Sequence, residues 1–197
     1  MTRLDDETIE KDEKNGKFPN PFERLFQTRT ITIFGEIDMK LAQDVTQKLL
    51  LLAADSDEPI KIFINSPGGH VESGDTIFDM IRFVKPEVKV IGTGWVASAA
   101  TTIYLAADKA NRFALPNTRF LIHQPLGGSR GDATDIKIQA EQIVKTRARI
   151  NQLIAAETGQ PLERVARDTD RDYWMSVDEA TAYGIVTKVI RSATELG

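Results

Sequence analysis

The chain has 197 residues, 41% of them hydrophobic and 27% charged, and it carries a net charge of −4 at pH 7. This composition is typical of a globular protein with enough residues for one sizeable hydrophobic core. The acidic balance and the lack of a dense basic run argue against a nucleic-acid or membrane-surface partner. Cysteine is absent, which excludes disulfide bonds and thiolate chemistry.

The N-terminal segment 1–20 is a polar arm, charged along most of its length and without the apolar stretch of a signal peptide. No window of the chain approaches the ~20 apolar residues that a membrane-spanning helix needs. These features and the lack of cysteine, which fits a reducing compartment, predict a cytoplasmic protein. The rest, 21–197, contains no linker and no repeat, and we expect it to form a single domain.

Strands and helices alternate along the first half of the chain. Periodicity and Gly/Pro breaks predict a strand over 29–34 closed by Gly35, a helix over 39–54, a strand over 60–64, a tight loop over 65–69, a helix over 73–84, a strand over 88–91 and a helix after Ser98. Such alternation is typical of βαβ units with parallel strands, so the fold class is α/β.

The second half is dominated by one long helix, predicted over about 133–158. Its apolar residues cover more than one face, which suggests burial by its own domain and by a neighbouring subunit. Around it we expect strands over 112–115 and 119–123, a short helix over 161–168, a helix over 176–183 opened by a capping box, and a last strand over 185–190.

Ser98 is the most informative candidate for catalysis. It stands among small residues in Gly94-Trp95-Val96-Ala97-Ser98-Ala99-Ala100, where a strand should turn into an apolar helix. A helix N-terminus offers free backbone N–H groups and a favourable dipole, which suit a nucleophile that builds an oxyanion beside itself. The alternative is an ordinary N-cap serine on a core helix.

The chain contains only two histidines, His70 and His123. His123 ends an apolar strand just before an irregular segment, which is where α/β folds place reactive groups. The alternative is a histidine that merely forms a hydrogen bond at a strand end. His70 follows two glycines, and an exposed loop position is the better interpretation for it.

A serine nucleophile needs a histidine base and a carboxylate that orients that base. Candidate acids lie in the charged run 167–172, and such runs usually form a solvated surface. This run ends against Tyr173 and Trp174, so its last member, Asp172, is the best placed to be drawn inward.

The double glycine Gly68-Gly69 follows a strand and permits a close backbone approach. The Gly69 and Ala99 N–H groups are candidates for the two halves of an oxyanion hole. No metal-ligand spacing, P-loop or dinucleotide fingerprint occurs, so we expect no metal and no cofactor.

Taken together, these motifs resemble the ClpP family of serine peptidases, the proteolytic subunits of ATP-dependent Clp proteases. Similar segments are Asn65–Gly69 for the oxyanion loop, Ala97-Ser98 for the nucleophile, Leu115–Gly128 for the histidine and Arg167–Asp172 for the aspartate. The similarity runs from about Thr30 to Ile190. It implies a triad of Ser98, His123 and Asp172.

The resemblance also implies the assembly. The fold would be the crotonase-like α/β fold, with two stacked seven-membered rings that enclose the active sites and the long helix as the handle between the rings. A hexameric AAA+ unfoldase such as ClpX, ClpC or ClpA would use ATP and feed in unfolded proteins.

The resemblance assigns further residues to three surfaces. Substrate binding would involve Pro125, Leu126, Gly127, Gly128 and Ser129, with the segment after Leu126 pairing with substrate backbone. The rings would touch through Asp170 and Arg171. The unfoldase pocket would be lined by Phe63, Phe83, Ile91, Phe113, Leu115 and Ile190. We expect apolar P1 residues, since Leu126, Ile150 and Leu153 should border the pocket.

Three departures from the family pattern leave alternatives open. Trp95 adds bulk before the serine, Lys61 and Thr93 replace aromatic and apolar residues of the docking surface, and the arm lacks the usual apolar start. One alternative is therefore a poorly active structural subunit that works in a mixed ring with a second ClpP-type subunit. Another is an acyl-CoA enzyme of the wider crotonase fold.

Overall fold

The computed structural model describes residues 20–196, so the predicted arm over 1–20 lies, except for Asn20, outside the described residues. Five parallel strands form the main path of one sheet, in the order β1-β2-β3-β4-β7. These strands are β1 (Thr30–Ile37), β2 (Ile60–Gly69), β3 (Val88–Ala97), β4 (Arg112–Ala114) and β7 (Lys188–Val189). The predicted α/β class with parallel strands is confirmed.

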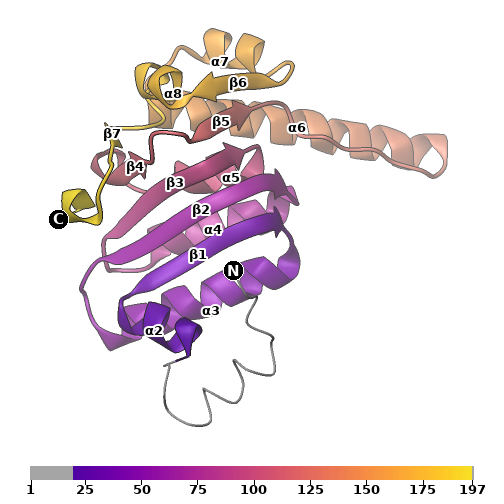
Figure 1. Ribbon diagram of the computed structural model, residues 1–197. Coiled ribbons are helices and arrows are strands. Elements are labelled where there is room, and N and C mark those ends of the chain that lie inside the picture. The colour runs from indigo at the N-terminus through magenta and orange to yellow at the C-terminus, as the bar shows by residue number, and fades with distance from the viewer. Residues whose placement is uncertain (1–19, 197) are drawn as a thin grey trace, which may run out of the picture.

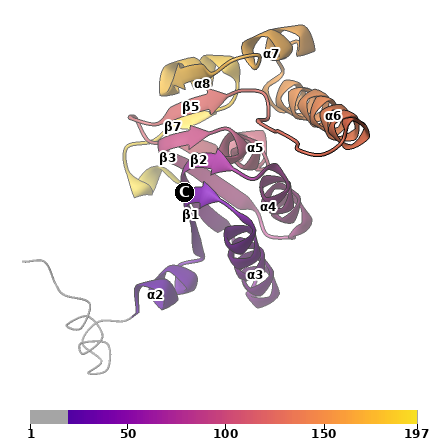
Figure 2. The same cartoon turned by 90° about the vertical axis from the view of Figure 1, so that its right-hand side faces the viewer.

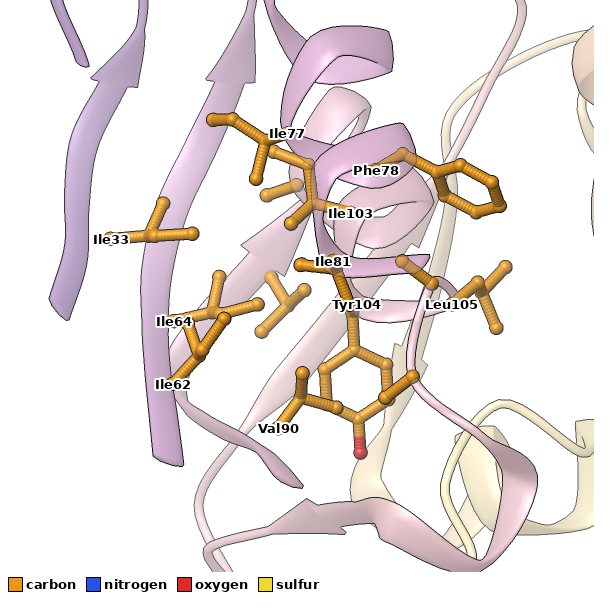
Figure 3. Close-up of a cluster of buried hydrophobic side chains, with 14 of the residues drawn as sticks. Ile33, Ile62, Ile64, Ile77, Phe78, Ile81, Val90, Ile103, Tyr104 and Leu105 are labelled. Carbon is orange, nitrogen blue, oxygen red and sulfur yellow. The ribbon is translucent and has the colours of Figure 1, made fainter. Parts of the chain in front are cut away.

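Helices cover one face of this sheet (Figure 2). They are α3 (Met39–Asp55), α4 (Val71–Phe83) and the short α5 (Ala99–Tyr104). The inward face of β2 carries Ile60, Ile62 and Ile64, each with no exposed surface, because successive side chains of a strand alternate between its faces. Figure 3 shows the cluster that they form with the helices. Burying each such side chain contributes about 1.5–3 kcal/mol.

Two short strands lie off the main path. β5 (Arg119–Ile122) pairs in parallel with the end of β3, and β6 (Tyr173–Ser176) pairs with β5 in the antiparallel sense. The prediction of a strand near 119–123 is thus confirmed within a residue. β6 was not predicted, because four residues carry no readable periodicity and only the pairing with β5 makes them a strand.

Strand ends differ most from the predictions. Gly35 does not end β1, which continues to Ile37 with a register shift between Phe34 and Glu36. The expected loop over 65–69 is instead the extended end of β2, where Ser66 pairs with Val96 and Gly69 pairs with Ile37. The last strand shortens to β7. Tertiary pairing sets these boundaries, which local composition does not encode.

The remaining helices lie at the two ends of the fold. They are α2 (Pro21–Gln27), which was not predicted and is capped by Asn20, then α6 (Ala133–Thr158), α7 (Leu162–Asp168) and α8 (Val177–Tyr183). Two short 3-10 turns, η1 (Lys109–Asn111) and η2 (Ala193–Leu196), complete the described chain.

The long helix α6 has the predicted bounds and projects beyond the rest of the molecule (Figure 1). Asp132 caps its start, and Gly159 ends it with a φ of 78°, a conformation that favours glycine. Its buried residues all lie near its C-terminus, whereas Ile136, Ile138 and Val144 are exposed. The coverage of this exposed part by a neighbouring subunit stays a prediction.

Arg112 ties the C-terminal end of α6 to the sheet. Its side chain is only 1% exposed. The guanidinium donates to the backbone oxygens of Ala107, Leu105 and Glu157 at 2.9–3.0 Å and forms an ion pair with the Glu157 carboxylate. A buried guanidinium needs this many acceptors, because leaving its donors unpaired would cost several kcal/mol.

The predicted capping box at the start of α8 is present. The Ser176 hydroxyl accepts from the Glu179 N–H at 3.3 Å, and the Glu179 carboxylate accepts from the Ser176 N–H at 2.8 Å. Hydrogen bonds from the backbone N–H and then the hydroxyl of Ser176 lower the pKa of Glu179 below its usual 4.5.

Because its folded-state pKa is lowered, the Glu179 carboxylate stabilises the fold above pH 4.5, and this contribution is lost as the pH falls through the lowered value. We therefore expect Glu179→Gln to lower the melting temperature near pH 7, with the difference from the parent shrinking as the pH falls below 4.5. Thermal denaturation against pH checks this. Glu163→Gln, outside any capping box, is the matched control, and a difference that persists at acid pH would contradict the prediction.

Candidate active site

Ser98 lies where β3 meets α5, as predicted, but it does not act as a side-chain cap. Its backbone has φ 58° and ψ −123°, and its side chain makes no capping hydrogen bond. A non-glycine residue in this region is strained by about 1–3 kcal/mol and persists only where its surroundings hold it. The Ser98 N–H donates to the Leu121 oxygen of β5 at 3.0 Å, which helps hold the turn. The plain N-cap alternative is therefore excluded.

Strand register brings His123 and Asp172 to the serine. Ala97 is opposite Leu121 in the β3–β5 pairing, and Ile122 is opposite Tyr173 in the β5–β6 pairing. The next residue on each strand belongs to the site. It is Ser98 after β3, His123 after β5 and Asp172 before β6, and the three meet at the same end of these adjacent strands. The unpredicted strand β6 places Asp172, the last residue of the charged run, beside His123, but the aspartate stays exposed and is not drawn inward as expected.

The three side chains form a continuous hydrogen-bonded chain. His123 Nε2 lies 2.8 Å from Ser98 Oγ, and His123 Nδ1 lies 2.9 Å from Asp172 Oδ1. An ionised carboxylate only accepts, so Nδ1 carries the ring proton and donates it, leaving Nε2 to accept from the serine hydroxyl. The His123 side chain is 15% exposed and Asp172 is 64% exposed, so the site is open to solvent on the aspartate side.

The double glycine lies directly against the nucleophile. At Gly68, with φ 96°, a Cβ would lie 2.6 Å from the Ser98 Cβ and 3.1 Å from the Ala99 nitrogen. At Gly69 it would meet the Ile37 oxygen at 2.2 Å. Neither position accepts a side chain, so both glycines are required for the close backbone approach that the sequence suggested.

Comparisons with known proteins agree with this geometry. The model of the Clp protease family matches residues 12–193. Proteolytic subunit 2 of the ATP-dependent Clp protease of Gluconobacter oxydans is 57% identical over 206 residues, which cover 99% of this chain and 92% of that protein. The chain belongs to the Clp protease family. It is a serine-type peptidase.

Other relatives carry similar names. Proteolytic subunit 3 of Rhizobium etli is 54% identical over 190 residues, which cover 95% of this chain and 98% of that protein. The solved structure of ClpP1 from Listeria monocytogenes has a TM-score of 0.82 and 56% identity, and covers 89% of this chain and 99% of that one. The predicted ClpP-type fold is thus confirmed, and these relatives are named as Clp protease subunits rather than as acyl-CoA enzymes.

A hollow opens beside the triad of this Clp protease chain. Besides Ser98, Ala99 and His123, its lining residues are Val71, Gly74, Asp75, Thr102, Ile122, Pro125, Ile150 and Ile154. Ile150 was predicted here and is present. Leu153 is not among the lining residues, and Leu126 is 84% exposed outside the hollow.

Asp75 is the acidic lining residue that the sequence pattern did not reveal. A signal was available, because Val71, Gly74, Asp75 and Phe78 follow the spacing of one helix face. The pattern identifies the shared face of α4, but only the structure places that face against the hollow.

The segment between β5 and α6 carries the predicted substrate-binding residues. The segment has no regular secondary structure over Pro125, Leu126, Gly127, Gly128 and Ser129, so its expected pairing with substrate backbone stays a prediction. Gly127 packs closely on α6, since a Cβ there would lie 2.7 Å from the Ile143 Cδ1. Leu126 and Ser129 are exposed.

The residues assigned to ring contacts lie next to the triad. Asp170 Oδ1 accepts from Arg147 of α6 at 3.0 Å, and the Asp170 backbone oxygen accepts from Gln124 Nε2 at 2.7 Å. Arg171 is exposed. Asp170, two residues before Asp172, is therefore connected both to the long helix and to Gln124, which follows His123.

An apolar cluster on the sheet face away from α3 and α4 contains most residues assigned to the unfoldase pocket. They are Phe63, Ile91, Phe113, Leu115 and Ile190, with Leu196 of η2 packed among them. Lys89 Nζ donates to the Leu196 oxygen at 2.7 Å, which holds this turn in place. Phe83 is not part of this cluster, because it ends α4 on the helical side, where it is 75% exposed, and its role in the pocket stays a prediction.

Trp95 leaves the nucleophile undisturbed. Its ring points to the surface and lies nearly parallel to that of Trp174, with centroids 6.2 Å apart, while Arg119 covers Trp174 at 4.4 Å.

His70 stands before α4, away from the triad, with Nδ1 2.9 Å from Ser73 Oγ and the side chain 53% exposed. This agrees with an exposed loop histidine.

Residues 20–196 contain no group of three or more His, Asp or Glu side chains placed to hold a metal ion. Among the same residues, no helix is long and apolar enough to cross a membrane.

The strained backbone at Ser98 yields a stability prediction. Ser98→Gly should melt at a higher temperature than Ser98→Ala, with a gain of about 1 kcal/mol, because glycine adopts this φ without strain. Differential scanning calorimetry at one protein concentration compares the two. The control is Thr76, which is exposed within α4. There the order should be reversed, because Thr76→Gly should be less stable than Thr76→Ala by about 1 kcal/mol. Equal melting of both Ser98 variants would contradict the interpretation.

Proposed function

We propose that the chain hydrolyses peptide bonds of unfolded proteins, with Ser98 as nucleophile, His123 as base and Asp172 as the residue that orients the base. The observation that carries this proposal is the hydrogen-bonded chain from Asp172 through His123 to Ser98 Oγ. The family supports the same chemistry.

The geometry supports a two-step acyl transfer. His123 Nε2 takes the hydroxyl proton while Ser98 Oγ bonds to the substrate carbonyl carbon, and the same nitrogen then gives the proton to the leaving amine as the C–N bond breaks. Water hydrolyses the acyl-enzyme by the reverse sequence of proton transfers. Asp172 stabilises the imidazolium that forms in each step.

Two backbone N–H groups are placed to hold the oxyanion. The Ala99 N–H belongs to the first residue of α5 and has no partner within the helix. The second group belongs to Gly69. The backbone N–H of the next residue, His70, donates to the Ile37 oxygen on the β1 side. Because neighbouring N–H groups of an extended strand point in opposite directions, the Gly69 N–H faces β3 and Ser98. Such donors are worth about 10²–10³ in kcat each.

Substrate backbone would add as a strand along the exposed residues Leu126, Gly127, Gly128 and Ser129. Their irregular conformation leaves backbone groups free to pair, and main-chain pairing gives affinity with little sequence preference. Pro125, which lines the hollow, would border the residue before the scissile bond.

For the assembly we propose one peptidase domain over 21–197, repeated in two stacked heptamers. The exposed apolar residues of α6 suit burial between rings, and Asp170 pairs with Arg147 in the middle of that helix. The relatives are named subunits 2 and 3. Those numbers favour, as the second candidate, a mixed ring in which this chain needs another ClpP-type subunit for full activity.

An AAA+ unfoldase such as ClpX, ClpC or ClpA would dock on the apolar cluster around Phe63 and Ile91 and use ATP to deliver substrates in the cytoplasm. Lys61 lies beside that cluster on β2, and Thr93 lies on β3. The peptidase itself would need no cofactor.

The first test is cleavage of a short fluorogenic peptide by the purified protein, with its native mass measured in the same buffer. We expect cleavage at the mass of a tetradecamer and its loss in Ser98→Ala, with assembly intact. An active Ser98→Ala enzyme would overturn the assignment of the nucleophile. A large assembly that cleaves only after a second ClpP-type subunit is added would favour the mixed ring.

Asp172→Asn should leave the assembly unchanged and lower kcat by about 10⁴-fold, the loss that a serine-protease triad shows when its histidine is held in the wrong tautomer. Steady-state kinetics on the same peptide measure this. Asp178→Asn, an exposed acid at the start of α8, is the matched control. A loss of less than tenfold would mean that Asp172 does not orient His123.

A further inference from the structure

The hollow beside the triad has one carboxylate in an otherwise mainly apolar wall. Val71, Ile122, Ile150 and Ile154 supply aliphatic surface, whereas Asp75 of α4 is the one acidic residue of the lining. Its side chain is 28% exposed. The hollow has a volume of about 20 Å³, room for little more than a water, so a substrate side chain beside Ser98 must part its walls and then meets aliphatic groups together with an acceptor.

Arg149 of α6 holds this carboxylate in a fixed orientation. Nη1 donates to Oδ1 at 3.0 Å, and Nη2 donates to Oδ2, which makes the pair bidentate. Each carboxylate oxygen has two acceptor sites, so the guanidinium uses one on each and leaves the other free. Arg149 does not line the hollow and is 47% exposed, so the substrate would meet the acid rather than the base.

The distance between Asp75 and the nucleophile is also fixed. The preceding residue, Gly74, packs against Ala99, where a Cβ would lie 3.2 Å from the Ala99 Cβ. This close approach holds the first turns of α4 against the start of α5, where Ser98 stands. The carboxylate thus belongs to the same rigid frame as the reacting oxygen.

We propose that Asp75, held by Arg149, selects the P1 side chain, the one before the scissile bond. It accepts side chains with an aliphatic stem that end in an uncharged hydrogen-bond donor, such as glutamine, and it excludes side chains that end in a carboxylate. This inference rests on the proposed peptidase function and replaces the expectation of a purely apolar P1 preference.

The physical basis is the difference between three side chains of similar length. Methionine fills the aliphatic part without using the free acceptor, and glutamine fills it and donates. Glutamate brings a second negative charge to the first and has no donor, and like charges placed opposite each other are disfavoured. Methionine loses little, because Arg149 already satisfies the carboxylate.

The test compares kcat/KM for three fluorogenic peptides that differ only in P1, with methionine, glutamine or glutamate. For the parent protein we expect methionine and glutamine within about threefold of each other, and glutamate about 30-fold lower. Asp75→Leu, which removes the acceptor and keeps the volume, should favour methionine over glutamine by about tenfold.

Asp75→Asn gives a result of the opposite sign. It removes the negative charge and leaves the Arg149 guanidinium without its carboxylate, so the P1 glutamate peptide should gain about tenfold relative to the methionine peptide. Asp79→Asn is the matched control. Asp79 lies one turn later on α4, is exposed and does not line the hollow, so the three ratios should not change.

Labelling of Ser98 by a fluorophosphonate, followed by intact mass, separates the proposed function from the role of Asp75. If Ser98 is neither labelled nor needed for cleavage, both the proposed function and this inference fail. If Ser98 is labelled and peptides are cleaved, but the three P1 ratios of Asp75→Leu and Asp75→Asn equal those of the parent, only the role of Asp75 is overturned.

Discussion

The active site depends on the position of one short strand. β5 leaves the main path of the sheet, pairs with the end of β3 on one side and accepts β6 on the other. Ser98, His123 and Asp172 each lie one residue beyond a backbone pair of this ladder. Their spacing is therefore set by main-chain hydrogen bonds rather than by the packing of long side chains, and this makes the 2.8 and 2.9 Å contacts compatible with an aspartate that is largely exposed.

The strain at Ser98 is held by the elements around it. A positive φ at a serine costs free energy, and the Ser98 N–H bond to Leu121, the buried α5 and the contact with Gly68 oppose its relaxation. The core contributes through burial of the isoleucines of β2 beneath α4 (Figure 3). The result is a reactive oxygen on a rigid frame, in which Gly68, Gly69 and Gly74 allow the backbones to approach.

The sequence predicts the parts of the site that local patterns encode. Ser98 follows a run of small residues and His123 ends an apolar strand, so both are readable without a structure. Asp172 needed the resemblance for its role, because the strand that positions it exists only through pairing with β5. Phe83 lies on the helical side at the end of α4, outside the apolar cluster of the sheet, so its place in an unfoldase pocket stays a prediction. Asp75 was missed, because helical periodicity shows which residues share a face of α4 but not which part of the molecule that face lies against.

The turn Ala193–Leu196 has a consequence for any ligand of the apolar cluster around Phe63. Leu196 already fills part of that cluster, and Lys89 holds its carbonyl oxygen. A ligand seated there competes with a segment of the same chain, whose local concentration is fixed by its tether and does not fall on dilution. The observed association constant of the ligand equals its intrinsic association constant multiplied by the fraction of molecules in which the turn has moved away. The stability of the turn Ala193–Leu196 therefore sets the ligand concentration at which binding begins.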